Sequence, residues 1–248
     1  SVADEDKAPC FSDAPMVRYY EAPLAAGRQK MDIKRAWEQR LNEVSAVFKT
    51  CPELSEGSAS FSFQILRTYF VNSEGSLVVQ NRVATRVMLM ASLKAADGME
   101  LPLNRDYFAY TPDDLPDNDR MIADARDMIK RLLALRDAPV ADPYTGPAIL
   151  SGPASGVFFH EIFGHRLEGH RLKSGGQTFK KMVGEQVLPV EFQVYCAPLL
   201  KRYADTDLYG HYVYDDEGVK ARRVDNVVNG VLKEFLMSRV PLDGFPSS

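Results

Sequence analysis

Three of the four histidines of this chain fall within residues 156–170, and a glutamate directly follows the first of them. Imidazole side chains can hold Zn²⁺, and a neighbouring carboxylate can take a proton from a water bound to the metal. The spacing is His160-Glu161-x-x-x-His165, one residue longer than the HExxH pattern of ordinary zinc peptidases. These three side chains are therefore the candidates for metal-assisted hydrolysis.

The extra residue has a geometric consequence. Positions i and i+5 lie about 140° apart around a regular α-helix, whereas positions i and i+4 lie about 40° apart. We therefore expect the helix to end, kink or carry a π-bulge between His160 and His165 if both are to face one ion. Gly164 directly precedes the second histidine and permits such a departure.

The alternative for these histidines is a hydrogen-bonded role without a metal. Two features favour a metal site, namely the adjacent Glu161 and the apolar neighbours that should bury the segment. These neighbours are Val157, Phe158, Ile162 and Phe163. A buried His-Glu pair without a task would cost desolvation free energy.

Composition places the chain among globular proteins of one large or two modest domains. It has 248 residues, of which 45% are hydrophobic, and 30 basic residues against 34 acidic ones, for a net charge of -4. The basic residues form no dense cluster, so we expect no nucleic-acid partner. No apolar run approaches the roughly 20 residues of a membrane helix, so we expect no membrane association.

The cysteines favour a reducing compartment. Cys10, Cys51 and Cys196 are odd in number, far apart and in no C-x-x-C pair, which does not indicate a disulfide framework. We therefore expect a cytoplasmic protein, although the chain begins at Ser1, so a leader could have been removed.

The elements that must position the candidate residues follow from periodicity. Apolar spacing of three and four predicts amphipathic helices over residues 32–49 and 117–136. Alternating aromatic and β-branched residues predict an antiparallel hairpin of residues 59–71 and 76–94. Residues 103–116 are predicted to be a loop.

A proline-rich stretch over residues 138–147 marks a domain boundary near residue 145. We expect an α+β fold: residues 1–145 form an N-terminal domain of helices packed on an antiparallel sheet. Residues 146–248 begin a mostly β domain that carries the HExxxH helix. Residues 148–150 are predicted to be a short buried strand, and Ser151 and Pro153 suit the start of the helix that follows.

The segment around His160 and His165 resembles a known family. The run GPAILSGPASGVFFHEIFGHRLEG at residues 146–169 is similar to the strand, turn and HExxxH helix of the TldD/PmbA proteins. Residues 69–75, 215–219 and 229–236 agree with the same family. Its members were once called modulators of DNA gyrase and are now regarded as metallopeptidases.

The resemblance implies a specific chemistry. The TldD-like branch carries HExxxH, and by that likeness His160 and His165 would ligate Zn²⁺ while Glu161 would act as general base. It also implies short or unfolded peptides as substrates, a homodimer or a heterodimer with a PmbA-like subunit, and a cytoplasmic location.

Two departures from the family pattern concern the ligands. The third zinc ligand of the family is a Cys downstream of the Asp-Asp-Glu-Gly turn, so we expect it beyond Ser248, because Cys196 precedes that turn. His170 stands where relatives tend to have an acidic residue, as a surface change or an additional ligand. A catalytic zinc usually takes three protein ligands, and besides His160 and His165 this chain could add only Cys196, His170 or His211. We therefore expect the 248 residues to bind zinc weakly or not at all.

A rival from another class is a non-catalytic subunit that binds peptides or acts as a scaffold, with the motif helix only packing an interface. A regulator of DNA topology is suggested by the old family name alone. The scattered basic residues argue against it.

Overall fold

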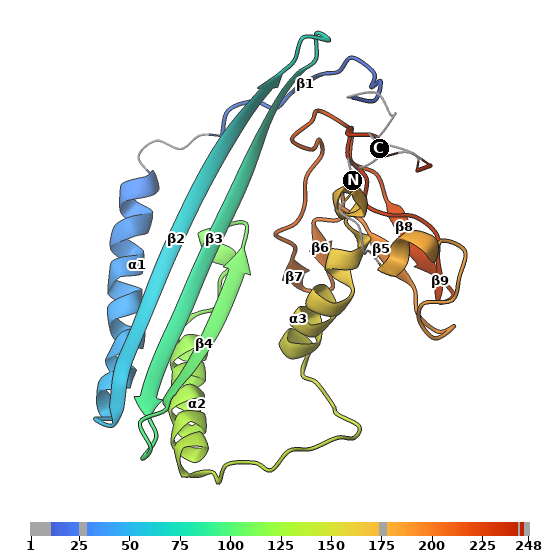
Figure 1. Ribbon diagram of the computed structural model, residues 1–248. Helices are drawn as coiled ribbons and strands as arrows, with labels where there is room; N and C mark the ends of the chain where they lie inside the picture. Colours follow the sequence, from blue (N-terminus) through green and yellow to red (C-terminus); the bar gives the residue numbers. More distant parts are fainter. Residues whose placement is uncertain (1–10, 25–28, 174–177, 243, 246–248) are drawn as a thin grey trace.

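The computed structural model describes residues 11–24, 29–173, 178–242 and 244–245. It forms a long sheet with two helices, followed by a smaller, more irregular part that lies beside the sheet (Figure 1). The expected α+β fold class is thereby confirmed.

The sheet is built on a long hairpin. Strands β2 (Leu54–Val71) and β3 (Leu77–Lys94) pair antiparallel, as the alternation predicted. On its other edge, β3 pairs with β1 (Arg18–Tyr20) in parallel at its start and with β4 (Glu100–Ala109) antiparallel at its end. Figure 1 shows β1 and β4 at opposite ends of β3.

The predicted loop over residues 103–116 is wrong for its first half, which belongs to β4. The strand contains Pro102, which has no N–H to donate. Pro102 lies opposite Ser92, at a non-hydrogen-bonded position of the ladder, so its nitrogen faces the open edge of the sheet. An edge strand tolerates a proline at such a position, so Pro102 is compatible with a strand.

Helices α1 (Gln29–Ala46) and α2 (Asn118–Asp137) pack against the sheet and against each other. The 3-10 turn η1 (Val47–Thr50) follows α1 in the chain and also packs against α2. The Asp117 side chain caps α2 by accepting from the Arg120 N–H at 2.9 Å. The ring of Trp37 stacks on Phe61 with centroids 4.4 Å apart. The buried core between helices and sheet includes Val44, Phe48, Val87, Leu89, Met121, Met128 and Leu132.

The smaller part is irregular. Its regular elements are α3 (Gly152–Ile162), η3 (Gly164–Leu167), η4 (Gly169–Lys173), η5 (Thr178–Lys181), β5 (Val194–Cys196), β6 (Arg202–Tyr203), β7 (Thr206–Asp207), β8 (Val224–Val228) and β9 (Val231–Leu232). Strands β5, β8 and β9 form one sheet, and β6 pairs with β7. A second core gathers Phe163, Leu167, Leu172, Phe179, Val227, Leu232 and Phe235.

Polar contacts fasten the smaller part to the long sheet. The Arg239 guanidinium is 1% exposed and donates to both carboxylate oxygens of Glu74, each at 2.6 Å, at the turn between β2 and β3. At the end of β4, the Tyr110 N–H donates to the Asp207 carboxylate at 3.0 Å. The two parts are thus joined at the β2–β3 turn and at the end of β4, which lies about midway along β3.

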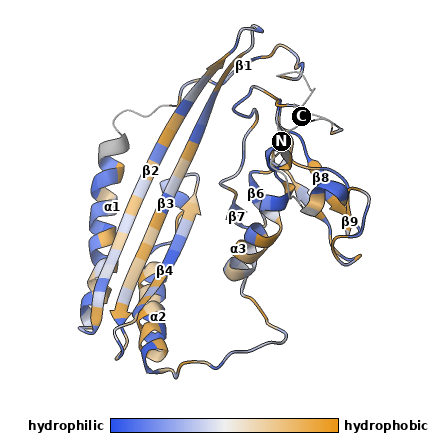
Figure 2. Cartoon of the chain, viewed as in Figure 1, coloured by the Kyte–Doolittle hydropathy of each residue, from blue (hydrophilic) through white to orange (hydrophobic). Residues whose placement is uncertain are grey.

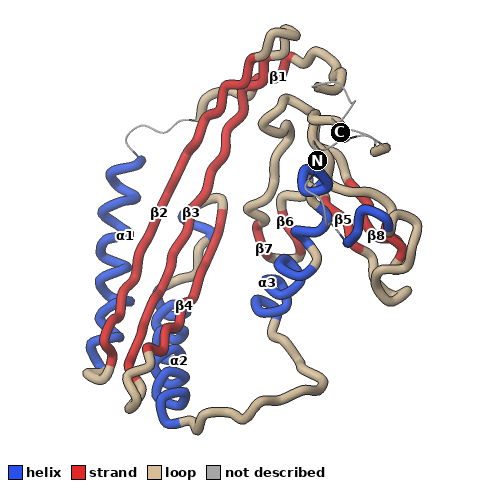
Figure 3. Tube along the Cα trace, in the orientation of Figure 1, coloured by secondary structure: helices blue, strands red, loops and turns tan. Residues whose placement is uncertain are grey.

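Residues 138–151 connect α2 to α3 without helix or strand (Figure 3). The predicted strand at residues 148–150 is therefore wrong, and the Ile149 side chain is fully exposed. The predicted division into residues 1–145 and 146–248 stays a prediction. Among the described helices, none is long and apolar enough to cross a membrane.

Candidate metal centre

Helix α3 positions the first two candidate residues near its C-terminal end. It begins after Ser151, which has an extended backbone, and Pro153 occupies the first turn, where its missing N–H costs nothing. It ends at Ile162, and the cap residue Phe163 leaves helical geometry at φ -126°, ψ -49°. The Phe163 ring is 4% exposed and packs in the second core, which anchors this end of the helix.

This end of the helix explains the five-residue spacing. Of the three predicted departures, the structure shows the first: α3 stops between His160 and His165, and the 3-10 turn η3 carries the second histidine. Gly164 adopts no positive φ, and a Cβ there would lie 3.7 Å from the His160 Nδ1, an ordinary contact. The departure is made at Phe163, so the predicted role of Gly164 is wrong.

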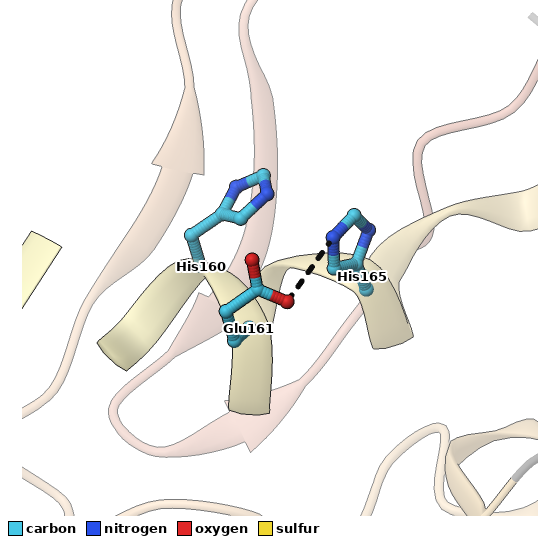
Figure 4. A group of neighbouring side chains, drawn as sticks. All are labelled: His160, Glu161 and His165. Carbon is cyan, nitrogen blue, oxygen red and sulfur yellow. Dashed lines mark ion pairs between the residues drawn. The ribbon is translucent and has the colours of Figure 1, made fainter. Parts of the chain in front are cut away.

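The three candidate side chains come together (Figure 4). One ligand atom from each of His160, Glu161 and His165 lies within 4.8 Å of the other two. The two imidazole rings have centroids 4.4 Å apart, at 67° to one another. The Glu161 Oε2 lies 3.6 Å from the His165 Nε2. Two imidazoles and a carboxylate thus share one small region.

A second carboxylate orients His165. The His165 Nδ1 lies 2.6 Å from the Glu168 Oε1 and 3.3 Å from the Arg171 Nη2; because a carboxylate only accepts, the shorter contact assigns the hydrogen to Nδ1. In the neutral ring Nε2 then keeps a free lone pair on the side of Glu161, which is the arrangement that metal-binding histidines use. The Arg171 guanidinium also donates to Glu168.

Burial raises the pKa of Glu168, but the hydrogen bonds from Arg171 and His165 outweigh it and hold that pKa below its usual range. Glu168 therefore stays ionised as a hydrogen-bond acceptor. We did not identify it as a functional residue from the sequence. Its position three residues after His165 was the available signal, but the contact depends on the 3-10 turn between them.

The expected burial of the motif helix is wrong. The side chains of Val157, Phe158 and Ile162 are 64%, 53% and 45% exposed, and His160 and Glu161 are exposed as well. Among the apolar neighbours named above, Phe163 is buried. The desolvation argument for a buried His-Glu pair therefore does not apply, and the proximity of the side chains carries the case instead.

The other possible ligands lie outside this group. The His170 side chain is 69% exposed and its Nε2 lies 3.6 Å from Glu168. The His211 Nδ1 lies 2.9 Å from the Pro198 carbonyl oxygen. Within the described part of the chain, no cysteine joins the group, Cys196 included. The group thus supplies two histidine ligands, one fewer than the three protein ligands that a catalytic zinc usually takes.

Sequence comparisons relate the chain to known metalloproteases. Residues 143–241 match the family model described as the PmbA/TldA metallopeptidase C-terminal domain. A metalloprotease of Methanothermobacter thermautotrophicus is 30% identical over 176 residues, covering 68% of this chain and 36% of that protein. A zinc metalloprotease TldD homolog of Saccharolobus solfataricus is 24% identical over 218 residues, covering 84% of this chain and 46% of that protein.

The fold has solved counterparts. TldE from Thermococcus kodakarensis superimposes with a TM-score of 0.56 at 17% sequence identity, covering 92% of this chain and 50% of that one. The chain thus spans half or less of the length of these relatives.

Proposed function

This chain belongs to the TldD/PmbA family, and on that premise we propose that it supplies the HExxxH centre of a TldD-like zinc-dependent peptidase that hydrolyses short or unfolded peptides. The observation that carries the proposal is the meeting of His160, Glu161 and His165 within 4.8 Å at the end of α3. The relative from Saccharolobus solfataricus bears the name zinc metalloprotease, which supports Zn²⁺ as the metal.

The residues take distinct roles in this proposal. His160 and His165 hold the metal through ring nitrogens, and Glu168 keeps the Nε2 of His165 available by accepting from its Nδ1–H. Bound zinc supplies Lewis-acid polarisation and a more acidic water. Glu161 takes the proton of the attacking water and delivers it to the leaving amine. Its exposed carboxylate is accessible for both transfers.

Zinc affinity tests the ligands. We expect the 248-residue chain to bind zinc more weakly than nanomolar, because it offers two histidine ligands in the described group. His160→Ala and His165→Ala should each abolish the binding, and His211→Ala should leave it unchanged. The measurement is competition against a fluorescent chelator. Nanomolar affinity of the wild-type chain would contradict the expected weak binding, and equal affinity in His160→Ala would contradict the ligand assignment.

Hydrolysis tests the base. In the protein as its gene encodes it, Glu161→Gln should lower the rate of peptide cleavage at least about a hundredfold while zinc content stays the same. The amide keeps the size of the side chain but cannot take the proton. Cleavage at an undiminished rate would remove Glu161 from the mechanism. If no variant or wild-type sample held zinc or cleaved peptides, the non-catalytic peptide-binding or scaffold subunit would become the better reading.

We further propose that the protein works as a homodimer or with a PmbA-like subunit, as the resemblance implies. The exposed apolar side chains of α3, Val157, Phe158 and Ile162, support an additional partner for this surface. Sedimentation analysis of the purified protein, alone and mixed with a PmbA-like protein, tests it. A monomer that stays unassociated at high concentration in both experiments would exclude the proposal.

A further inference from the structure

The long strand β3 has a gap in its pairing. Its β1 partner ends opposite Val79 and its β4 partner begins opposite Thr85, so residues 80–84 pair with β2 alone. The backbone groups of alternate residues face this edge, as shown by the Val79 carbonyl, which accepts from the Glu21 N–H at 2.9 Å. The same alternation directs the backbone groups of residues 81 and 83 into the gap.

The backbone N–H and C=O groups that face the gap are only partly hydrogen-bonded. The Asn81 N–H donates to the Glu21 Oε2 at 2.7 Å, which replaces the missing strand at that point. The N–H and C=O of Val83 have no hydrogen-bond partner among the described residues. An unpaired donor and acceptor at a sheet edge form a template for another strand.

A cavity of about 740 Å³ lies along this gap. It is lined by residues 80–83 of β3, by Leu66 and Thr68 of β2, by Glu21, by tyrosines that include Tyr19, Tyr110 and Tyr212, and by residues 209–216. Its size is in the range of small-ligand sites, roughly 300–1,000 Å³. None of the three residues of the metal centre lines it.

The cavity carries opposite charges at its two ends. Asp215 and Asp216 lie at the β1 end, because the backbone of the preceding Tyr214 bonds the Gln80 amide. Lys201 lies at the β4 end, where its carbonyl accepts from the Tyr110 hydroxyl at 3.1 Å. A peptide amino group would be favoured at the acidic end and a carboxylate at the basic end.

We propose that this cavity binds a short peptide with free ends, which adds to the edge of β3 as a strand between β1 and β4. The Val83 backbone would pair with the peptide backbone, as in other cases of strand addition. The charges orient the peptide with its amino end toward β1, parallel to β3. The gap spans five residues of β3, 80–84, so a peptide of about five residues matches its length. The site is separate from the proposed metal centre and does not depend on it.

Amide exchange and binding of one probe test the proposal. The probe is the free-ended pentapeptide Ala-Thr-Val-Thr-Ala, whose β-branched residues favour an extended backbone. In the 248-residue chain without the peptide, the Val83 amide should exchange rapidly, whereas the Leu89 amide, which pairs with β4, stays protected. Saturating peptide should slow exchange at Val83 at least tenfold and leave Leu89 unchanged.

Two pairs of variants locate the contact. Val83→Pro removes the edge N–H and should weaken binding at least tenfold, whereas Val83→Thr keeps the backbone donor and should bind like wild type. Asp216→Asn with Lys201→Met should weaken the free-ended peptide several-fold but leave the N-acetylated, C-amidated peptide unaffected. The charge variants keep the test valid if Val83→Pro fails to fold. His160→Ala should bind the peptide normally, which separates this proposal from the zinc centre.

Three results would overturn the proposal. One is no binding of the pentapeptide to the folded wild-type chain. A second is binding without slower exchange at Val83. The third is protection of Val83 before any peptide is added, because another segment would then already occupy the edge.

Discussion

Helices α2 and α3 differ in what holds them in place. In α2 one face is polar and the other apolar, and the apolar face, with Met121, Met128 and Leu132, is buried against the sheet. Helix α3 is more apolar along its length, yet none of its eleven residues is buried (Figure 2). Its position depends on its ends, chiefly on Phe163 in the second core. Apolar composition therefore does not by itself predict burial, because burial also needs a partner surface in the same chain.

The difference matters for function. Packing in α2 fixes side chains that have no chemical role, whereas the free sides of α3 leave His160 and Glu161 accessible to a metal, water and substrate. A helix anchored at one end presents its last turn without covering it.

The largest effect is expected in the core of α2. Leu132→Ala should lower the free energy of unfolding by about 3 kcal/mol, because Leu132 is 1% exposed and its removal leaves a cavity. Urea unfolding followed by the fluorescence of Trp37, the single tryptophan, reports on this core directly. The matched control is Leu135→Ala, on the same helix but 52% exposed, which should change the stability by less than about 0.5 kcal/mol. Equal losses in both variants would show that α2 is not packed on one face.

A smaller effect is expected where α2 meets β4. The Tyr107 hydroxyl donates to the Asp124 Oδ2 at 2.7 Å, and Asp124 is 8% exposed. Tyr107→Phe should lower the free energy of unfolding by about 1.5 kcal/mol at pH 7, because a buried charged acceptor loses a donor. Tyr203→Phe, at a 68% exposed tyrosine, serves as the control for loss of a hydroxyl and should have little effect.

The effect of Tyr107→Phe should depend on pH. Burial raises the pKa of Asp124, but the hydrogen bonds from Tyr107 and Arg120 outweigh this effect and hold the pKa below its usual value. A depressed pKa adds stability above the unfolded pKa of about 3.9, and this stability is lost as the pH falls through the folded pKa. The gap between wild type and variant should therefore narrow below about pH 4. A constant gap down to pH 2 would place the effect in packing rather than in the charged hydrogen bond.

The same contrast decides what could be predicted from the sequence. Helix α2 and the β2–β3 hairpin followed from periodicity because their partner surfaces lie within this chain. Strand β4 did not, because Pro102 and its polar residues resemble a loop until the edge position is known. The prediction that α3 is buried was wrong for the converse reason, since its apolar side chains have no partner surface among the described residues and stay exposed.

The candidate site divides in a similar way. Residue type and spacing were enough to single out His160, Glu161 and His165, and the required end of the helix between the histidines is confirmed. Glu168 could not be assigned a role from spacing alone, because its contact with His165 requires the turn geometry after Phe163. Local periodicity thus located the chemistry, while the surrounding hydrogen bonds required the structure.

The smallest effect is expected on α3 itself. Ile162 is 45% exposed at the last position of the helix, directly beside the metal centre. Ile162→Ala should change the free energy of unfolding by less than about 0.5 kcal/mol, because little of its side chain leaves an apolar environment. Circular dichroism is the appropriate probe, since Trp37 lies in the other core. Leu135→Ala provides a control of similar exposure on α2.

A loss above about 1.5 kcal/mol for Ile162→Ala would contradict the exposure of this face in solution. The dependence of the unfolding midpoint on protein concentration would then identify what covers Ile162. If a second copy covers Ile162, the wild-type unfolding midpoint should rise with protein concentration, and the variant should lose that dependence. If the midpoint of both proteins is independent of concentration, the cover must come from within the same chain. The contrast between α2 and α3 would then be one of degree, with both helices positioned by packing along their length.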